Sequence, residues 1–210
     1  MSDVAASSSA STMLDLHDDW NLFAIGALNL LHVPWWFGLS SAASLTSFLF
    51  YAGCGYLILD SCWLIFVPSC VPKASRATLL MHHVVVCGCM PFAWGKPLLM
   101  RHLLRTWTVE VHSWNHIACR RLQPGRLTRA LTWLNKPLFV GLRMVVFPLT
   151  WVRYAQDRAL LSAAEVAAHA PTRLHVPLSL AHAAMYGLML KWGWGLLGFG
   201  NRMHKKPASS

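Results

Sequence analysis

Charge is scarce in this sequence, and negative charge is the scarcest kind. Only 12% of the 210 residues are charged, and eight Asp and Glu stand against eighteen Lys and Arg. A soluble domain usually carries about 25% charged residues, whereas this chain is 55% hydrophobic. No nucleic-acid-binding motif interleaves the basic residues. We therefore attribute the basic excess to membrane topology and loop solvation, and expect a membrane protein that binds no nucleic acid.

The motifs of several enzyme classes are also absent. The sequence has no Gly-rich phosphate loop, no GxSxG nucleophile elbow and no internal repeat. No cationic segment precedes the first apolar run, so a cleaved signal peptide is not expected. Residues 1–12 (MSDVAASSSAST) are small and polar. We expect a disordered N-terminal tail there, because such a segment has little apolar surface to bury.

Metal-ligand patterns are sparse. The six cysteines lie mostly within apolar runs, where we expect small buried residues rather than disulfides. Cys87-Gly-Cys89 has no second cysteine pair, which argues against a zinc site. His112 and His116 are spaced i, i+4, as on metal-binding helices, but too few other histidine motifs accompany them. We expect no metal site.

Apolar runs are what the sequence does have. Six of them are near the roughly 20 residues that a bilayer-spanning helix needs. Their expected bounds are 20–40, 43–67, 77–94, 98–119, 133–153 and 174–200. They lack the period-two alternation of a barrel strand. The predicted fold is all-α, an integral membrane bundle of about six transmembrane helices around a central polar cavity.

The polar run 98–119 should be buried among the other helices, because it is too polar to face lipid on all sides. The transmembrane domain is expected over residues 13–201, with a basic C-terminal tail at 202–210. Six spans place both termini on one side, which also holds the greater share of Lys and Arg, so both termini are predicted to be cytosolic. Lys205-Lys206 is similar to an endoplasmic-reticulum dilysine signal, and this membrane is the expected location.

The few ionisable residues inside the expected spans fall in one layer. With a rise of about 1.5 Å per residue, they lie roughly 8–15 Å from the cytosolic ends of their helices. They are Asp60, His82, His83, Glu110, Arg143 and Lys191. One interpretation is a functional polar centre. The other is a set of ion pairs that only hold the helices together.

The adjacent histidines favour the functional interpretation. Neighbouring residues on a helix project about 100° apart, so one of His82 and His83 can face a cavity while the other contacts a neighbouring helix. Asp60 lies at matching depth and is expected to orient one imidazole. The sequence alone does not indicate which histidine faces inward.

These polar residues follow one another in a particular order. Tyr56-Leu-Ile-Leu-Asp60 comes first, then His82-His83, then Glu110 with Ser113, and then Arg143 followed by Pro148 and Tyr154. The ordered series resembles the TLC-domain family, the multi-spanning endoplasmic-reticulum proteins that include the ceramide synthases. The resemblance covers about residues 20–200.

In the ceramide synthases the double histidine is catalytic in the joining of an acyl-CoA to a sphingoid base. By this resemblance His82 or His83 would act as base or acyl acceptor, with Asp60 orienting the ring. Acyl-CoA would be a co-substrate, and no other cofactor is expected. The side chains expected to contact lipid, CoA or a developing oxyanion are Tyr56, Glu110, Ser113, Arg143 and Lys191.

One motif of the ceramide synthases is missing. They carry His-Asp-x-x-Asp nearly thirty residues after the double histidine, where this chain reads Glu110-Val-His-Ser-Trp-Asn115. The sequence is closer to the other branch, whose members affect membrane lipid composition, transport or trafficking. The predicted function is membrane lipid homeostasis. The alternatives are an acyl-CoA-dependent sphingoid-base N-acyltransferase and a non-catalytic transport or trafficking adaptor that acts through loop 120–129. Membrane lipids are the expected partners, and a homodimer stays an open alternative.

Overall fold

The described part of the chain is helical throughout. The computed structural model describes residues 2–39, 43–169 and 171–197, and these contain helices and short connections without a β-strand. The all-α fold predicted from the apolar runs is therefore confirmed. The expected tail at 202–210, including Lys205-Lys206, lies outside the described residues.

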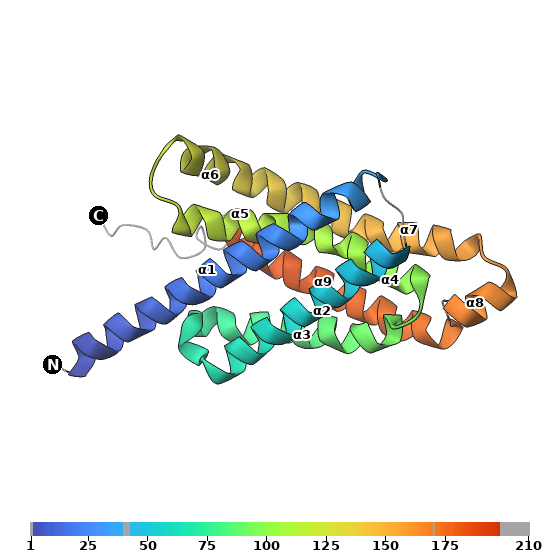
Figure 1. Ribbon diagram of the computed structural model, residues 1–210, viewed down its shortest axis with the longest axis horizontal. Helices are drawn as coiled ribbons and strands as arrows, with labels where there is room; N and C mark the ends of the chain where they lie inside the picture. The colour runs from blue at the N-terminus through green and yellow to red at the C-terminus, as the bar shows by residue number, and fades with distance from the viewer. Residues whose placement is uncertain (1, 40–42, 170, 198–210) are drawn as a thin grey trace, which may run out of the picture.

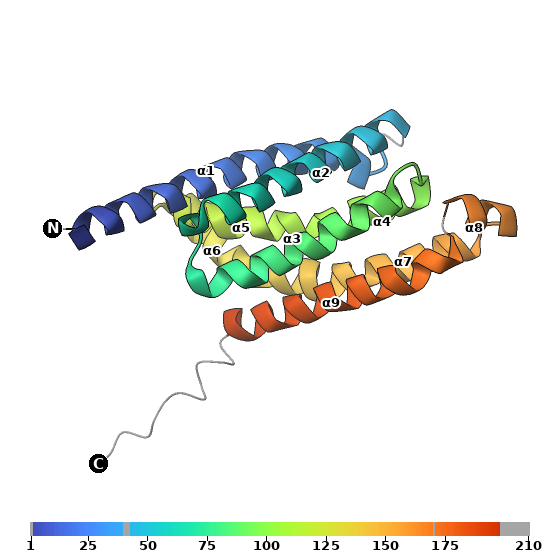
Figure 2. The same ribbon diagram turned by 90° about the horizontal axis from the view of Figure 1, so that it is seen from below.

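Six helical rods lie side by side along the long axis of the molecule (Figure 1, Figure 2). Two of the rods change helix type along their length: η2 is a 3₁₀-helix and η3 is a π-helix. The rods are α1 (Ser2–Trp36), α2 (Ala43–Phe66), α3 (Lys73–Ala93), α4–η2–α5 (Pro97–Thr106, Trp107–Val109, Glu110–Arg121), α6–η3–α7 (Arg126–Leu138, Phe139–Val146, Phe147–Ala159) and α9 (Thr172–Leu196). The short elements η1 (Pro68–Cys70) and α8 (Ala163–His169) lie in the connections.

Fewer helices than predicted have the length and composition of a membrane span. Among the described residues three do so: Ala43–Phe66, Ser75–Ala93 and Arg126–Ala159. The six predicted spans are thus not confirmed. The other rods carry more polar residues along their length, such as Asn21, Asn29 and His32 in α1. The predicted span 133–153 also belongs to a longer helix, which begins seven residues earlier and runs without a break for 34 residues.

The polar rod α4–η2–α5 occupies the centre of the bundle, as its composition predicts. α4 contacts α2, α3 and α7, and α5 contacts α1 and α6. The apolar face of α4 supplies much of the largest core cluster, including Leu98, Leu99 and Leu104. Because other rods surround it, this rod can carry charged and histidine side chains that a lipid-facing helix would not tolerate.

Helix α1 begins at Ser2, where we predicted a disordered tail over residues 1–12. That prediction considered only the buried apolar surface. Once a helix is nucleated, each added residue gains a backbone hydrogen bond, and alanine has the highest helix propensity. An Ala- and Ser-rich segment can therefore continue a helix that is anchored further along.

The anchor is a set of ion pairs between α1 and the end of α5. Arg120 donates to both carboxylate oxygens of Asp18, at 2.8 and 3.1 Å. Arg121 donates to Asp19 at 2.7 and 2.9 Å and to Asp15 at 2.5 Å. The topology prediction counted these two arginines as cytosolic positive charge. In the structure they form ion pairs with three carboxylates.

Glycines mark the places where rods approach most closely. A methyl group on Gly193 of α9 would lie 2.7 Å from Phe139 Cε1, and one on Gly53 of α2 would lie 3.1 Å from the ring of Trp107. Small residues of this kind let helices pack closely where lipid supplies no hydrophobic driving force.

The cysteines differ in part from the prediction. All six are free thiols, but only Cys70 is buried, and Cys62 is exposed on the outer face of α2. The prediction overlooked that a membrane helix can carry a thiol toward lipid as readily as toward the protein core.

Candidate functional site

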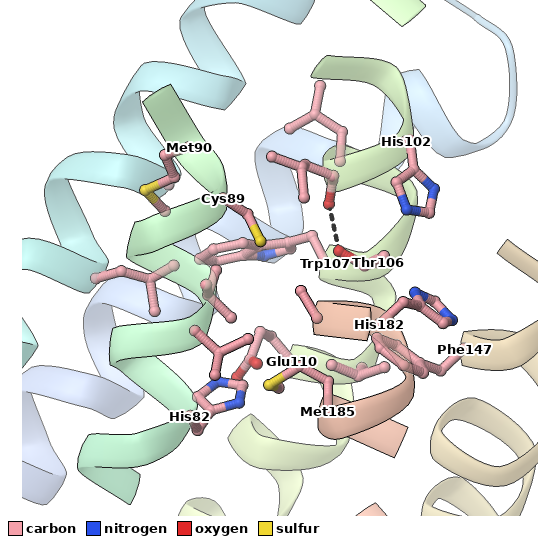
Figure 3. Close-up of a pocket in the computed structure, with 18 of the residues that line it drawn as sticks. His82, Cys89, Met90, His102, Thr106, Trp107, Glu110, Phe147, His182 and Met185 are labelled. Atoms are coloured by element: carbon pink, nitrogen blue, oxygen red, sulfur yellow. Dashed lines mark hydrogen bonds between the residues drawn. The ribbon is translucent and has the colours of Figure 1, made fainter. Parts of the chain in front are cut away.

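A cavity of about 100 Å³ lies inside the bundle, between α2, α3, α4, η2, α7 and α9 (Figure 3). We predicted a polar cavity, but most of the lining is apolar, with Phe50, Leu57 and Met189 among the contributing side chains. Its polar lining consists of His82, His102, Thr106, Glu110 and His182. The cavity differs from the predicted polar one because leucine, valine and methionine side chains fill the helix faces between these polar groups.

His82 lies at one end of the cavity, with Glu110 and Met185 (Figure 3). Its ring is buried against Trp192 of α9, with ring centroids 5.9 Å apart. Its Nδ1 has no hydrogen-bond partner within the described residues. A buried imidazole nitrogen without a partner can form a hydrogen bond with a polar group of a ligand that reaches it.

His83 faces the opposite way, as the angular spacing of adjacent helix residues allows. Its Nε2 lies 3.4 Å from Asp60 Oδ2, and its Nδ1 lies 3.1 Å from the Ser61 hydroxyl, both on α2. The histidine pair is thus divided: His82 lines the cavity, and His83 connects α3 to α2.

Asp60 joins His83 to a second histidine, which comes from α1. His17 Nε2 donates to Asp60 Oδ1 at 2.8 Å, and both side chains are buried. Asn21, one helical turn after His17, has its Nδ2 3.1 Å from the same His17 nitrogen. Tyr56 then donates from its hydroxyl to Asn21 Oδ1 at 3.0 Å. The result is a buried polar network that fixes both rings against a single carboxylate.

His17 and Asn21 were missed by the sequence analysis, because residue 17 lies before the first predicted span. Their spacing of i, i+4 does place them on one face of a helix. This spacing could have identified both residues if the first helix had been extended toward the N-terminus.

Arg143 lies on the other side of His82. It is buried on the π-helix η3, and its Nη2 donates to the Ser113 hydroxyl at 2.5 Å. Its guanidinium carbon lies 5.3 Å from the centroid of the Trp192 ring, which in turn contacts His82. Trp192 therefore connects the guanidinium to the histidine that lines the cavity.

Glu110 is the acidic group of the cavity wall. It is half-buried at the start of α5, and in the described chain it forms no ion pair within 4 Å. Glu110 and His82 therefore place a carboxyl group and an imidazole in the lining of the same cavity.

Lys191 does not join the other predicted site residues. Its side chain is exposed, whereas Met189 and Met185 give the buried face of α9. Two residues further along a helix correspond to a rotation of about 200°, which turns Lys191 away from Met189. The depth estimate for Lys191 placed it in the right layer but did not consider which face of the helix it occupies.

Histidines also occupy the opposite end of the cavity, where no motif indicated them. The rings of His102 and His182 are 5.7 Å apart, and His182 stacks on Phe147 at 4.2 Å (Figure 3). His102 Nδ1 and His182 Nε2 lack hydrogen-bond partners within the described residues. Polar groups without partners thus lie at both ends of an otherwise apolar cavity.

Comparison with protein-family models, curated proteins and solved structures gave no match. The geometry of the site is therefore the basis for its interpretation. A search of the described residues for three or more clustered His, Cys, Asp or Glu ligands found no such group.

Proposed function

We propose that this chain is a TLC-type multi-pass membrane protein of the endoplasmic reticulum that acts in membrane lipid homeostasis. In this proposal the cavity receives the polar group of a membrane lipid. The observation that carries the proposal is the position of His82, whose side chain lines an apolar cavity inside the bundle and whose buried Nδ1 has no hydrogen-bond partner in the described residues. A buried polar atom without a partner costs about 1–3 kcal/mol, and a bound ligand can offset that cost.

The size of the cavity limits what enters it. Pockets for drug-sized ligands span roughly 300–1,000 Å³, and this cavity measures about 100 Å³. A hydroxyl, amine or carboxyl group with a few methylenes fits this volume, and a whole acyl chain does not. The lipid therefore inserts its polar group while its chains lie between or outside the rods.

The test compares single histidine variants. Lipid extracted with the purified protein and the lipidome of expressing cells would be measured for the wild type, His82→Gln and His83→Gln. The exposed His116, changed to Gln, is the matched control. We expect His82→Gln to lose the bound lipid and the lipidome change, because the His82 side chain lines the cavity. His116→Gln should behave like the wild type.

Equal lipid binding and equal lipidomes for the wild type and His82→Gln would contradict the proposal. If loop 120–129 were then required while both histidines were dispensable, the adaptor alternative would replace it. The structure makes that loop partly structural, since Arg120 and Arg121 are engaged by α1.

An acyl-CoA-dependent N-acyltransferase is the second candidate, and the network around the two histidines favours it. The amine nitrogen of a sphingoid base would attack the thioester carbon, forming the amide bond as the carbon–sulfur bond breaks. His82 would take the amine proton and return it to the CoA thiolate. This candidate requires release of free CoA, measured with a long-chain amine and acyl-CoA. Absence of release over a broad substrate panel, with lipid still bound, would leave the first proposal alone.

A further inference from the structure

A second hollow, of about 470 Å³, opens on the outer face of the bundle at the end where α1 finishes and α4 begins. Its lining residues come from the end of α1, from α4, from η2 and from the η3–α7 segment. We call it the arginine groove, because Arg101, Arg105 and Arg153 line it. Helix α4 separates it from the inner cavity, since Arg101 and Arg105 face the groove while His102 and Thr106 face the cavity.

The groove carries excess positive charge. Asp157 accepts a hydrogen bond from Arg105 at 2.5 Å and lies 3.6 Å from Arg153 Nε. Arg101 is exposed and forms no ion pair with any described residue. The groove thus holds three guanidinium groups and one carboxylate, which two of them share. Guanidinium groups in such an arrangement match the geometry of phosphate oxygens, which they bind through paired N–H donors.

The groove continues into an apolar strip toward the middle of the bundle. Leu149 and Val146 precede Arg153 by one and two turns on the same face of the η3–α7 segment, because residues four and seven positions apart share a helix face. Trp35 and Trp36 border the charged part, and tryptophan is enriched where membrane meets water. The order of cation, tryptophan and aliphatic side chain matches the order of phosphate, interface and acyl chain in a phospholipid.

We propose that the arginine groove binds a membrane phospholipid, with its phosphodiester between Arg101 and Arg153 and an acyl chain along Leu149 and Val146. The site is separate from the cavity at His82 and does not rest on a role for that cavity in lipid homeostasis. It requires only that the Arg126–Ala159 helix, which includes Arg153, lies in a membrane, as its length and composition indicate.

Lipid retention by purified protein tests the proposal. The protein would be reconstituted in phosphatidylglycerol–phosphatidylcholine nanodiscs, extracted, and analysed for bound phospholipid by native mass spectrometry. The Arg101→Gln/Arg153→Gln double variant should retain at least tenfold less phospholipid than the wild type. The matched control is Arg126→Gln/Arg129→Gln, which removes two exposed arginines from α6, away from the groove. It should retain phospholipid at the wild-type level.

A second variant separates lipid from free anions. Leu149 is 55% exposed, so Leu149→Trp can fill the apolar strip without altering a charge or the core. It should lower phospholipid retention but leave binding of inorganic phosphate unchanged. Arginine-dependent binding of inorganic phosphate without phospholipid retention would overturn the proposal. So would equal retention by the wild type and the double arginine variant.

Discussion

Asp60 is the residue on which the buried polar network depends, because its carboxylate contacts histidines from two other helices. His17 of α1 and His83 of α3 both direct Nε2 toward it. A carboxylate buried between two imidazoles fixes the orientation of both rings. Asp60 therefore connects α2 to α1 and α3 directly beside the histidine that lines the cavity.

Asp60→Asn is predicted to lower the free energy of unfolding by about 1–3 kcal/mol, because it weakens hydrogen bonds between buried groups. Thermal unfolding of the detergent-solubilised protein would measure the effect. Asp19→Asn is the matched control, since Asp19 is exposed and pairs with Arg121. An exposed ion pair contributes about 0–1 kcal/mol. Equal losses of thermal stability in the two variants would contradict a central role for Asp60.

For single residues, the sequence predicted which residue types belong to the site better than it predicted where their side chains point. Asp60, His82, His83 and Arg143 were identified because ionisable residues are rare in apolar runs. The structure connects Asp60 to His83 and His83 to His82, and Trp192 connects His82 to Arg143. Lys191 fitted the same criterion, yet it points outward. Depth follows from counting residues along a helix, whereas the face that a helix buries depends on which neighbours surround it.

At the scale of helices, contact between α9 and the π-helix η3 depends on a missing side chain. Gly193 is buried against the ring of Phe139, which is 1% exposed. Any Cβ at that position meets the aromatic carbons below normal contact distance. Arg143, four residues after Phe139, depends on the same interface for its position beside Trp192.

Gly193→Ala is predicted to destabilise the protein by about 1–3 kcal/mol through overpacking. Gly187→Ala, on the same helix, is the control, because a Cβ there has no described neighbour within 4 Å. It should leave stability unchanged or raise it by about 1 kcal/mol, since alanine favours helix over glycine. Thermal unfolding of the two variants compares them directly. A stabilised Gly193→Ala would show that the two rods do not approach as described.

The bounds of helices were predictable where apolar runs have sharp ends. Span 43–67 corresponds to α2 within one residue at its end. The run 98–119 was recognised, but its 3₁₀ segment at Trp107–Val109 was not, because no proline or glycine marks the change. The long extension of α1 was missed for a different reason. It is held by ion pairs to α5, and pairs between residues about 100 positions apart in sequence leave no local pattern.

On the scale of the whole molecule, the α6–η3–α7 rod is longer than a bilayer core requires. Its 34 residues correspond to about 50 Å, against a hydrocarbon thickness of about 30 Å. A rod of this length must tilt or extend beyond the core when it crosses a bilayer, and we predict that its two ends lie on opposite sides of the membrane.

Cysteine labelling can test this arrangement. Gln123→Cys precedes the rod and Leu160→Cys follows it, and both positions are exposed. In a Cys62→Ser background, an impermeant maleimide should label these positions from opposite sides of sealed microsomes. The remaining native cysteines are buried or half-buried, and the Cys62→Ser parent measures their background. Labelling of both positions from one side would mean that this rod does not cross the membrane.

Helix α4 is a shared wall, with the histidine cavity on one face and the arginine groove on the other. A shift of this helix toward the groove enlarges the cavity and narrows the groove, and a shift the other way does the reverse. Ligands that favour different positions of α4 are then thermodynamically linked, and each changes the affinity of the other by the same factor. Under the two proposals, a phospholipid in the arginine groove would in this way set the occupancy of the inner cavity.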